Sequence, residues 1–183
     1  MPHVIVKTSA GLVRGSGDRI VRFLGIPYAA APFRANRFAA PAPVQPWDDV
    51  RDALEFGPTP PGAGLAPESM MIYPAPVIPG EDCLNLNVWT PGLTGRLPVV
   101  VWFAGGANVM GSSAQPVFDG SAFARDGVVL VSVNHRLGVE GFAHLPDAPA
   151  NRAVLDQIAA LTWVRDNIAQ FGGDPDMVTV AGV

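Results

Sequence analysis

The chain has 183 residues, of which 49% are hydrophobic and 15% charged, with a formal net charge of −4 at pH 7. This composition is typical of one globular domain, and the acidic balance gives no electrostatic footprint for nucleic acid. No apolar run approaches the ~20 residues of a membrane-spanning helix, so we expect no membrane partner. The single cysteine has no internal disulfide partner and the first residues lack a signal-peptide pattern, so a cytoplasmic location is expected.

Residues 3–24 predict a small antiparallel element. Segment 3–8 alternates apolar and polar residues, and short turns at 9–11 and 15–18 separate it from two further strand-like segments. Apolar-polar segments joined by turns of this length form hairpins. The N-terminal part of the chain is therefore expected to form an antiparallel edge of a sheet.

Residues 25–80 predict irregular chain. The segment contains many prolines, which are unsuited to a central strand or a long helix. Aromatic residues in its first part indicate a coil packed on a core. The stretch 58–80 has fewer such anchors, and we predict that it is a mobile loop.

Three segments after residue 80 predict strands. Residues 81–89 alternate in polarity, whereas 99–103 and 127–133 are continuous apolar runs, typical of strands covered on both faces. Because only a short turn separates the first two segments, we expect them to be neighbours in the sheet.

The clearest helix is predicted over residues 151–170. Asn151 is a reasonable N-cap, and Gly172 and Gly173 end the helix. Six apolar residues lie on one stripe at helical spacing, which predicts a buried face formed by Val154, Leu155, Ile158, Leu161, Val164 and Ile168.

The order of these elements predicts an α/β fold. After the helix, a turn over 174–176 leads into a last strand over 178–182. The succession strand, crossover, strand, helix, strand favours a parallel sheet with an antiparallel N-terminal edge. All of residues 1–183 are expected to belong to this one domain.

A turn of small residues follows the strand 99–103. Its sequence is Ala104-Gly105-Gly106-Ala107. Loops at the carboxyl ends of parallel strands carry the chemistry of α/β folds, and small residues let the backbone approach a ligand. We interpret this turn as an oxyanion hole, although a pair of glycines can also simply end a strand.

Four segments resemble the type-B carboxylesterases, a family of α/β-hydrolase fold that includes para-nitrobenzyl esterases and cholinesterases. They are FLGIPYA at 23–29, EDCLNLNVWTP at 81–91, NHRLG at 134–138 and LDQIAALTWVRDNIAQFGGDP at 155–175. The likeness covers essentially the whole chain in the right order. It implies hydrolysis of small-molecule carboxylic esters by a Ser-Glu/Asp-His triad through an acyl-serine intermediate, without a cofactor or a metal.

The resemblance also implies where the nucleophile lies. Gly182 matches the first glycine of the G-x-S-x-G turn, and Val183 matches the residue before the serine. We therefore expect residues 1–183 to be the N-terminal half of an α/β-hydrolase, cut before the nucleophile elbow and inactive alone. A bare 178–182 edge would then permit self-association or pairing with a C-terminal portion. The alternative is a non-catalytic binding or interaction protein on the same fold.

By the same resemblance, the oxyanion donors are the backbone amides of Gly106 and Ala107. The family has His-Gly-Gly-Gly where this chain has residues 104–107. Alanine can replace glycine there only if the required φ is negative or the strain is tolerated. These departures favour a weakened or retired site.

Two structural ion pairs are implied by position in the family. Arg37 is expected to meet Glu81, and Arg136 is expected to meet Asp156. Each charge lies inside an otherwise apolar segment, where an unpaired charge would be costly.

Other reactive side chains are not expected to be catalytic. Ser112 and Ser113 follow the glycine turn with no general base beside them, so we interpret them as solvated turn serines. In secreted members of the family that the chain resembles, the cysteine at the position of Cys83 pairs with an upstream cysteine. Because Thr59 stands near that upstream place here, Cys83 is expected to be free and buried. No spacing of residues fits a metal site. None of the three histidines, His3, His135 and His144, matches the catalytic histidine of the family, and His135 is expected to be a packed structural residue.

Overall fold

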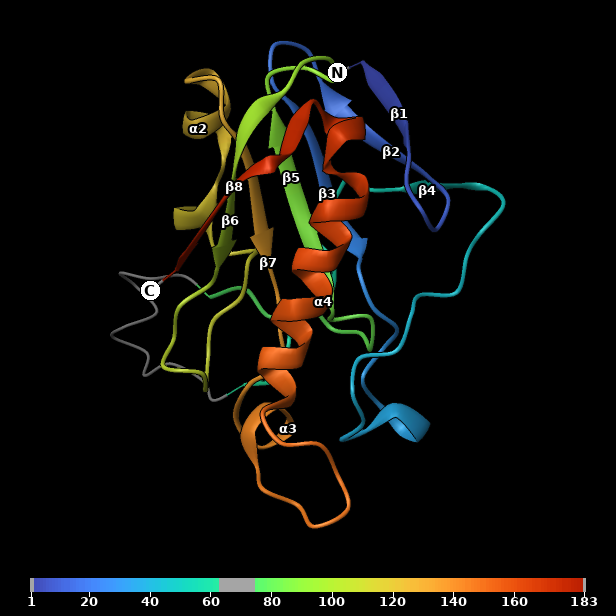
Figure 1. Cartoon of the computed structure of the whole chain (residues 1–183), viewed down its shortest axis with the longest axis vertical. Coiled ribbons are helices and arrows are strands. Elements are labelled where there is room, and N and C mark those ends of the chain that lie inside the picture. Colours follow the sequence, from blue (N-terminus) through green and yellow to red (C-terminus); the bar gives the residue numbers. More distant parts are fainter. Residues whose placement is uncertain (1, 63–74, 183) are drawn as a thin grey trace.

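An eight-stranded mixed sheet lies at the centre of the computed structural model, which describes residues 2–62 and 75–182 (Figure 1). Helix α4 (Arg152–Asn167) crosses one face of the sheet, and the short α2 (Ser121–Arg125) covers part of the other. The remaining helical elements are α3 (Gly138–Phe142) and the 3₁₀ turns η1 (Arg34–Asn36), η2 (Pro116–Phe118) and η3 (Ile168–Phe171). The strands are β1 (His3–Lys7), β2 (Leu12–Gly17), β3 (Val21–Pro27), β4 (Val50–Asp52), β5 (Asn85–Thr90), β6 (Leu97–Phe103), β7 (Val129–Val133) and β8 (Gly173–Gly182).

The sheet joins a parallel part to an antiparallel part. Its strand order is β1-β2-β3-β5-β7-β6-β8, with β4 paired to β2. Strand β6 runs parallel to both β7 and β8, whereas the successive pairs from β1 to β7 are antiparallel. The predicted α/β arrangement with an antiparallel N-terminal edge is confirmed.

The expectation that β5 and β6 are neighbours is wrong. Strand β7 lies between them, antiparallel to β5 and parallel to β6. A crossover from β6 through α2 has to return a parallel strand beside β6, and β7 takes that place. The short turn between β5 and β6 therefore spans the width of one strand.

Helix α4 has the predicted position but a different buried face. Val154 and Ile158, which the predicted stripe placed inside, are 43% and 54% exposed. Val164 and Ile168 of the predicted stripe are buried, as expected. The stripe did not include the other buried residues of α4, most of which are small or polar, namely Arg152, Ala153, Asp156, Ala160, Trp163 and Asn167. Asn151 stands at the N-cap with φ 52°, and its side chain makes no capping bond.

The two faces of β6 are covered unequally. Val99 and Val101 are fully buried beneath α4, in the main core. Val100 and Trp102 point to the opposite face and are only half-buried. The continuous apolar run had predicted a strand covered on both faces, but the second face of β6 is covered only in part.

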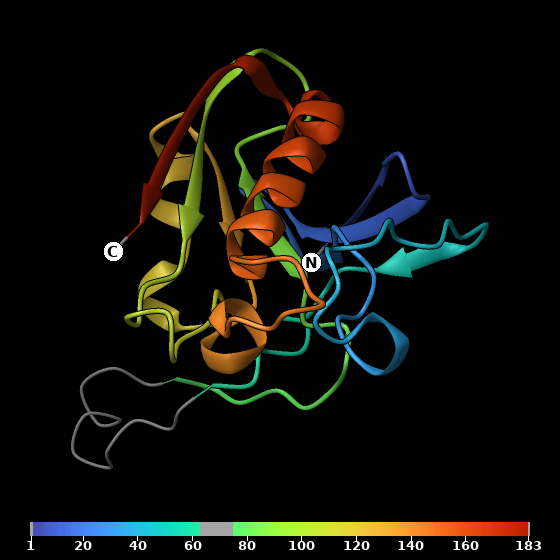
Figure 2. The same ribbon diagram turned by 60° about the horizontal axis from the view of Figure 1, so that its bottom comes forward.

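Strand β8 begins earlier than predicted and contains an irregularity. Leu97 pairs with Gly173 and Val99 with Val178, so β8 accommodates extra residues between these two pairs. The predicted turn over 174–176 falls in this irregular part, where Arg96 binds the carboxylate of Asp174 at 2.7 Å. Beyond it β8 runs beside β6 at the edge of the described sheet (Figure 2).

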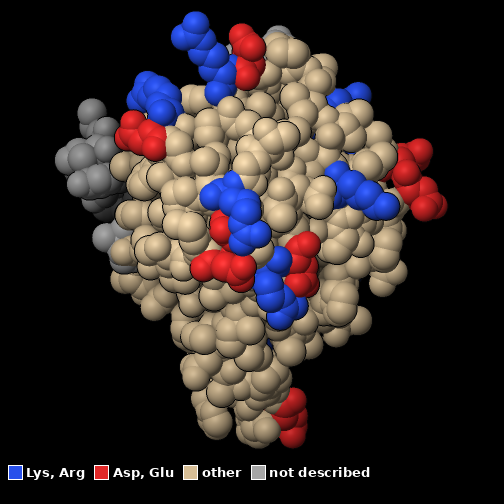
Figure 3. Space-filling view, turned by 45° about the horizontal axis from the view of Figure 1, so that its top comes forward, with Lys and Arg blue, Asp and Glu red and all other residues tan. Residues whose placement is uncertain are grey.

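The surface carries mixed charges. On the face that Figure 3 shows, acidic and basic side chains lie beside one another, among many uncharged residues. No described helix combines the length and apolar character that crossing a bilayer requires. Of the loop predicted over 58–80, residues 63–74 lie outside the described part of the chain, and its mobility stays a prediction.

Candidate oxyanion site

The predicted site lies where β6 and β8 end together. The two strands run parallel with Phe103 in register with Gly182, so the loop after β6 starts beside the end of β8 (Figure 2). The carboxyl ends of parallel strands are the usual place for a ligand in α/β sheets. The sheet therefore brings the glycine turn next to the position from which the family's nucleophile turn departs.

The turn has a left-handed backbone. Gly106 has φ 139°, and Ala107 and Asn108 follow with φ 53° and 61°. The carbonyl oxygen of Gly106 accepts hydrogen bonds from the amides of Val109 at 3.0 Å and Met110 at 3.2 Å, which closes the turn. A Cβ at Gly106 would lie 2.1 Å from the carbonyl oxygen of Met110, so only glycine fits there.

Ala107 shows that the loop tolerates strain. Its φ is positive, so the alanine occupies a conformation that favours glycine. An alanine can replace the family's glycine here if φ is negative or if the strain is tolerated. Since φ of Ala107 is positive, the second condition applies. The methyl group is exposed and does not obstruct the fold of the loop.

The amides of Gly106 and Ala107 have no hydrogen-bond acceptor among the described residues. No backbone carbonyl in residues 2–62 and 75–182 accepts a hydrogen bond from either of them. Consecutive unpaired N–H groups in a left-handed turn form a concave anion site. Such a pair can stabilise the oxygen that becomes negative during acyl transfer.

A neighbouring glycine and a neighbouring loop fix the turn. A Cβ at Gly111 would approach the carbonyl oxygen of Gly105 to 2.3 Å, so the two ends of the turn touch. The amide of Gly138, at the start of α3, donates to the carbonyl oxygen of Asn108 at 2.7 Å. The loop after β7 thus supports the loop after β6.

The ion pair of Arg136 and Asp156 is present and fully buried. The guanidinium and the carboxylate are 2.7 Å apart, and the Arg136 amide donates to the same carboxylate at 3.0 Å. Arg136 also donates to the carbonyl oxygen of Ala39 at 2.7 Å. The pair ties the loop after β7 to helix α4 and to the proline-rich coil.

The expected pair of Arg37 with Glu81 is wrong. Arg37 binds Glu140 at 2.7 Å, and Glu81 binds Arg34 at 2.9 Å. Arg34, in the turn η1, has φ 55°, and it is this residue rather than Arg37 that meets the acid. The Arg34–Glu81 pair is exposed and Arg37 is exposed in the other pair, so we expect each pair to contribute little to stability.

Arg152 is a buried structural residue that sequence reasoning missed. Its guanidinium donates to the carbonyl oxygens of Val139, Glu140, Ala143 and Pro149 at 2.8–3.1 Å. These contacts satisfy carbonyls at both ends of the segment that contains α3, and they add a second donor to the carbonyl of Val139. An arginine in the first turn of the predicted helix, directly after its N-cap, was the available signal.

The serines after the turn are buried, so their interpretation as solvated residues is wrong. Ser113 is hydrogen-bonded through its hydroxyl to the side-chain amide of Asn87 at 3.0 Å. The hydroxyl of Ser112 has no partner among the described residues. An amide cannot act as a general base, so the bond to Asn87 does not activate Ser113 as a nucleophile.

Cys83 and His135 are packed residues. Cys83 is free and fully buried, and burial, with the nearby Asp156 charge, raises the pKa of its thiol to about 12. It is therefore not a thiolate nucleophile at neutral pH. His135 is buried, with its ring 6.3 Å from that of Phe103 and its Nδ1 2.9 Å from the Arg136 carbonyl oxygen.

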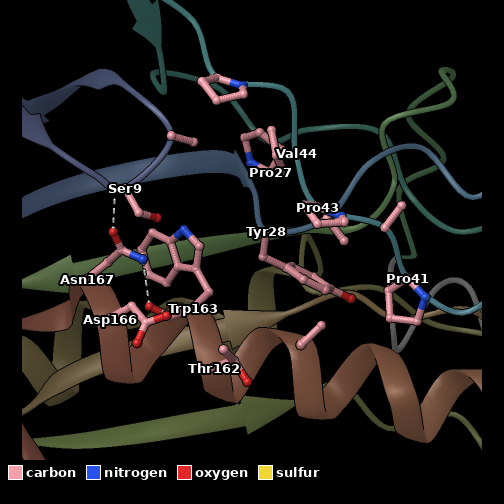
Figure 4. Close-up of a pocket in the computed structure, with 15 residues that line it drawn as sticks. Ser9, Pro27, Tyr28, Pro41, Pro43, Val44, Thr162, Trp163, Asp166 and Asn167 are labelled. Carbon is pink, nitrogen blue, oxygen red and sulfur yellow. Dashed lines mark hydrogen bonds between the residues drawn. The ribbon is translucent and has the colours of Figure 1, made fainter.

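A separate pocket of about 460 Å³ lies between α4 and the coil 41–46 (Figure 4). The Tyr28 hydroxyl at its wall donates to the carbonyl oxygen of Asn134 at 2.6 Å. The side-chain oxygen of Asn167 accepts from the Ser9 amide at 2.7 Å, while its nitrogen donates to Trp163. Because these polar groups already bind one another, the pocket is a weaker candidate for chemistry than the glycine turn.

Metal chemistry finds no support in the described side chains. Within residues 2–62 and 75–182, no group of three or more His, Cys, Asp and Glu residues could hold an ion.

Comparisons with known proteins agree on one family. The family model described as "Carboxylesterase family" matches residues 2–183. The chain is 44% identical over 191 residues to the para-nitrobenzyl esterase of Bacillus subtilis, matching 100% of this chain and 38% of that one. Against human carboxylesterase 3 the identity is 45% over 199 residues, covering 97% of this chain and 34% of the relative.

Solved structures give the same result. A structure named PNB esterase superposes with a TM-score of 0.89 at 42% identity, over 99% of this chain and 38% of that one. A Geobacillus stearothermophilus carboxylesterase gives 0.83 at 42% identity, over 97% of this chain and 38% of its own. The chain therefore spans little more than a third of the relatives that it matches.

Proposed function

The chain belongs to the carboxylesterase family, and we propose that it is the oxyanion-binding part of a carboxylic ester hydrolase that acts through a serine acyl-enzyme. One observation carries the proposal: the loop that begins beside the end of β8 contains the amides of Gly106 and Ala107, which donate to no described backbone carbonyl. The names of the relatives support small-molecule carboxylic esters as substrates.

In the proposed reaction, a serine hydroxyl attacks the ester carbonyl and its proton passes to a histidine. The carbonyl oxygen becomes negative, and the amides of Gly106 and Ala107 donate to it. Collapse of the intermediate expels the alcohol with the proton, and water then cleaves the acyl-serine by the same steps. Loss of one such donor costs roughly 3–4 kcal/mol of transition-state stabilisation.

We propose that residues 1–183 alone do not hydrolyse esters. The serine expected from the family pattern would follow Val183, and the acid and histidine would come later in a longer chain. The test compares the 183-residue chain with a chimaera in which these residues continue into the C-terminal remainder of the Bacillus subtilis esterase. The chimaera should hydrolyse para-nitrophenyl acetate and the short chain should not.

A second variant keeps this test decisive if the chimaera does not fold. The loop 104–107 can be grafted into the complete Bacillus subtilis esterase, which provides its own triad. Retained turnover supports the oxyanion role of the loop. Turnover by the 183-residue chain alone, or loss of more than about 10²-fold in the folded graft, contradicts the proposal.

A second candidate is a non-catalytic binding protein on the same fold. Alanines at 104 and 107 replace a histidine and a glycine of the family pattern, and Ala107 is strained, with φ 53°. This candidate predicts that the chimaera folds but is inactive, and that Ala104→His with Ala107→Gly restores turnover.

We also propose that the edge of β8 pairs with another chain, either a second copy or a C-terminal portion. Val180 on this strand is 55% exposed, and apolar edges invite pairing. Light scattering of the chain and of a Val180→Lys variant tests this, because the lysine should reduce association. The cytoplasmic location stays a prediction.

A further inference from the structure

We propose that a buried network of asparagine and serine side chains beneath the glycine turn is the positioning device of the oxyanion hole. Ser113 is its attachment point to the loop, and Asn87 and Asn134 hold that point from two strands of the sheet. The inference rests on the proposed function, since it concerns the placement of the same two amides. The members of this Asn–Ser network are Asn85, Asn87, Ser113, Ser132 and Asn134.

Asn87, in the middle of β5, uses all of its hydrogen-bonding groups inward. Its side-chain nitrogen donates to the hydroxyls of Ser113 and Ser132, each at 3.0 Å. Its side-chain oxygen accepts from the Gly25 amide at 2.9 Å. The side chain is fully buried, so water cannot replace a lost partner without entering the core.

Asn134, directly after β7, holds Ser113 from the other side. Its side-chain oxygen accepts from the Ser113 amide at 2.8 Å, and its nitrogen donates to the side-chain oxygen of Asn85 at 3.0 Å. The backbones of Asn134 and Asn85 are also hydrogen-bonded at 3.0 Å. Ser113 is thus fixed through both its hydroxyl and its amide.

The fixed serine is connected to the turn of the two donors through the residues just before it in the chain. Gly111, two residues before Ser113, packs against the carbonyl oxygen of Gly105, with no room for a Cβ. Gly106 in turn accepts from the Met110 amide, so the segment from Gly105 to Ser113 is folded on itself. A displacement of Ser113 therefore displaces the turn that carries the amides.

Stability alone does not explain this choice of residues. The network places amides and hydroxyls in the centre of a sheet, where apolar side chains would pack without a desolvation cost. A fully bonded polar network defines one arrangement of the groups it joins. Displacements of about 1 Å in a catalytic group can cost ~10²-fold in rate. A network that holds the turn in one arrangement would therefore preserve the reaction rate.

The neighbouring serines provide a matched test. Ser113→Ala removes a bonded hydroxyl, whereas Ser112→Ala removes a buried hydroxyl that has no partner among the described residues. In the 183-residue chain, amide exchange measured by NMR follows the bonded amides of Val109, Met110 and Gly138, which report on the turn. We expect Ser113→Ala to accelerate their exchange by about tenfold, Ser113→Cys to restore part of the protection and Ser112→Ala to leave it unchanged. Equal effects of the two alanine variants would overturn the inference.

An activity measurement in the chimaera separates positioning from mere folding. Ser113→Ala should lower kcat by ~10-fold or more with little change in KM, and Ser112→Ala should change neither. If the chimaera folds but it and all its variants are inactive, the proposed function fails, while the exchange result still decides whether the network holds the loop. An active chimaera whose kcat is unaffected by Ser113→Ala contradicts the positioning role.

Discussion

The loops that follow β6 and β7 leave the same end of the sheet but use their polar groups in opposite ways. In the loop after β7, the buried Arg136 binds the buried Asp156 of α4, and the carbonyls around α3 accept hydrogen bonds from the buried Arg152 of α4. In the turn after β6, the side chains are small and the amides of Gly106 and Ala107 bind no described backbone carbonyl. The first loop is bound into the scaffold, whereas the two amides of the second have no described backbone acceptor.

The difference teaches how a strained turn can persist beside a rigid neighbour. The loop after β7 donates the Gly138 amide to Asn108, and it supplies Asn134 to Ser113. Binding residues are commonly placed on loops that a rigid framework positions. Changes in the scaffold loop should therefore affect global stability, and changes in the turn should affect local geometry.

The largest effect is expected from the buried ion pair. Asp156→Asn leaves the Arg136 charge buried without a carboxylate, which should lower the free energy of unfolding by about 3–5 kcal/mol. Glu140→Gln removes the partner of the exposed Arg37 and should cost at most about 1 kcal/mol. Urea unfolding measures both, and similar losses would erase the distinction between scaffold and surface pairs.

A smaller effect is expected from a methyl group in the turn. Gly106→Ala places a Cβ against the Met110 carbonyl and should cost about 1–3 kcal/mol or rearrange the turn. Gly92→Ala is the control, because a Cβ there meets no atom within 4 Å. A Gly106→Ala variant as stable as Gly92→Ala, with unchanged exchange at Met110, would mean that the described turn geometry is incorrect.

The pH dependence of the free energy of unfolding tests the burial of the Cys83 thiol in the scaffold. Burial and the Asp156 charge raise the pKa of the folded thiol to about 12, above its ordinary value. The unfolded thiol ionises first, so stability is unaffected below about pH 9 and falls by up to about 1.4 kcal/mol per pH unit between roughly 9 and 12. Cys83→Ala should remove this component of the slope, and an identical slope in both proteins would show that the thiol ionises normally.

The smallest effect concerns the strained alanine. Ala107→Gly should raise the free energy of unfolding by about 0.5 kcal/mol, because the positive φ suits glycine. Ala104→Gly, at a position without a positive φ, should lower it by about 0.5–1 kcal/mol. Thermal unfolding of the two variants gives opposite shifts in Tm if the turn is strained only at Ala107.

Much of the fold followed from local patterns, and the errors have physical causes. Alternating segments and apolar runs located β5, β6 and β7, but pairing depends on crossover geometry, so the place of β7 between the other two was missed. The apolar stripe located α4 and two residues of its buried face, Val164 and Ile168, but not the buried Arg152, Asp156 and small residues beside them. Arg34 and Arg37 are three residues apart, and the sequence could not show which of them pairs with Glu81 before the turn η1 was known.

The candidate site was predicted only in part. The glycine turn was recognisable because small residues follow an apolar strand, and the structure gives its left-handed backbone. The Asn–Ser network was not recognisable, since its members are spread from Asn85 to Asn134 and meet only through the sheet.

A crystal structure of the chimaera after reaction with a para-nitrophenyl phosphonate tests the central claim most directly. The phosphonyl oxygen imitates the negative oxygen of the acyl-transfer intermediate. We predict that the amide nitrogens of Gly106 and Ala107 both lie about 2.7–3.1 Å from it. A phosphonylated serine whose oxygen is bound elsewhere, with these two amides turned away, would contradict the oxyanion assignment.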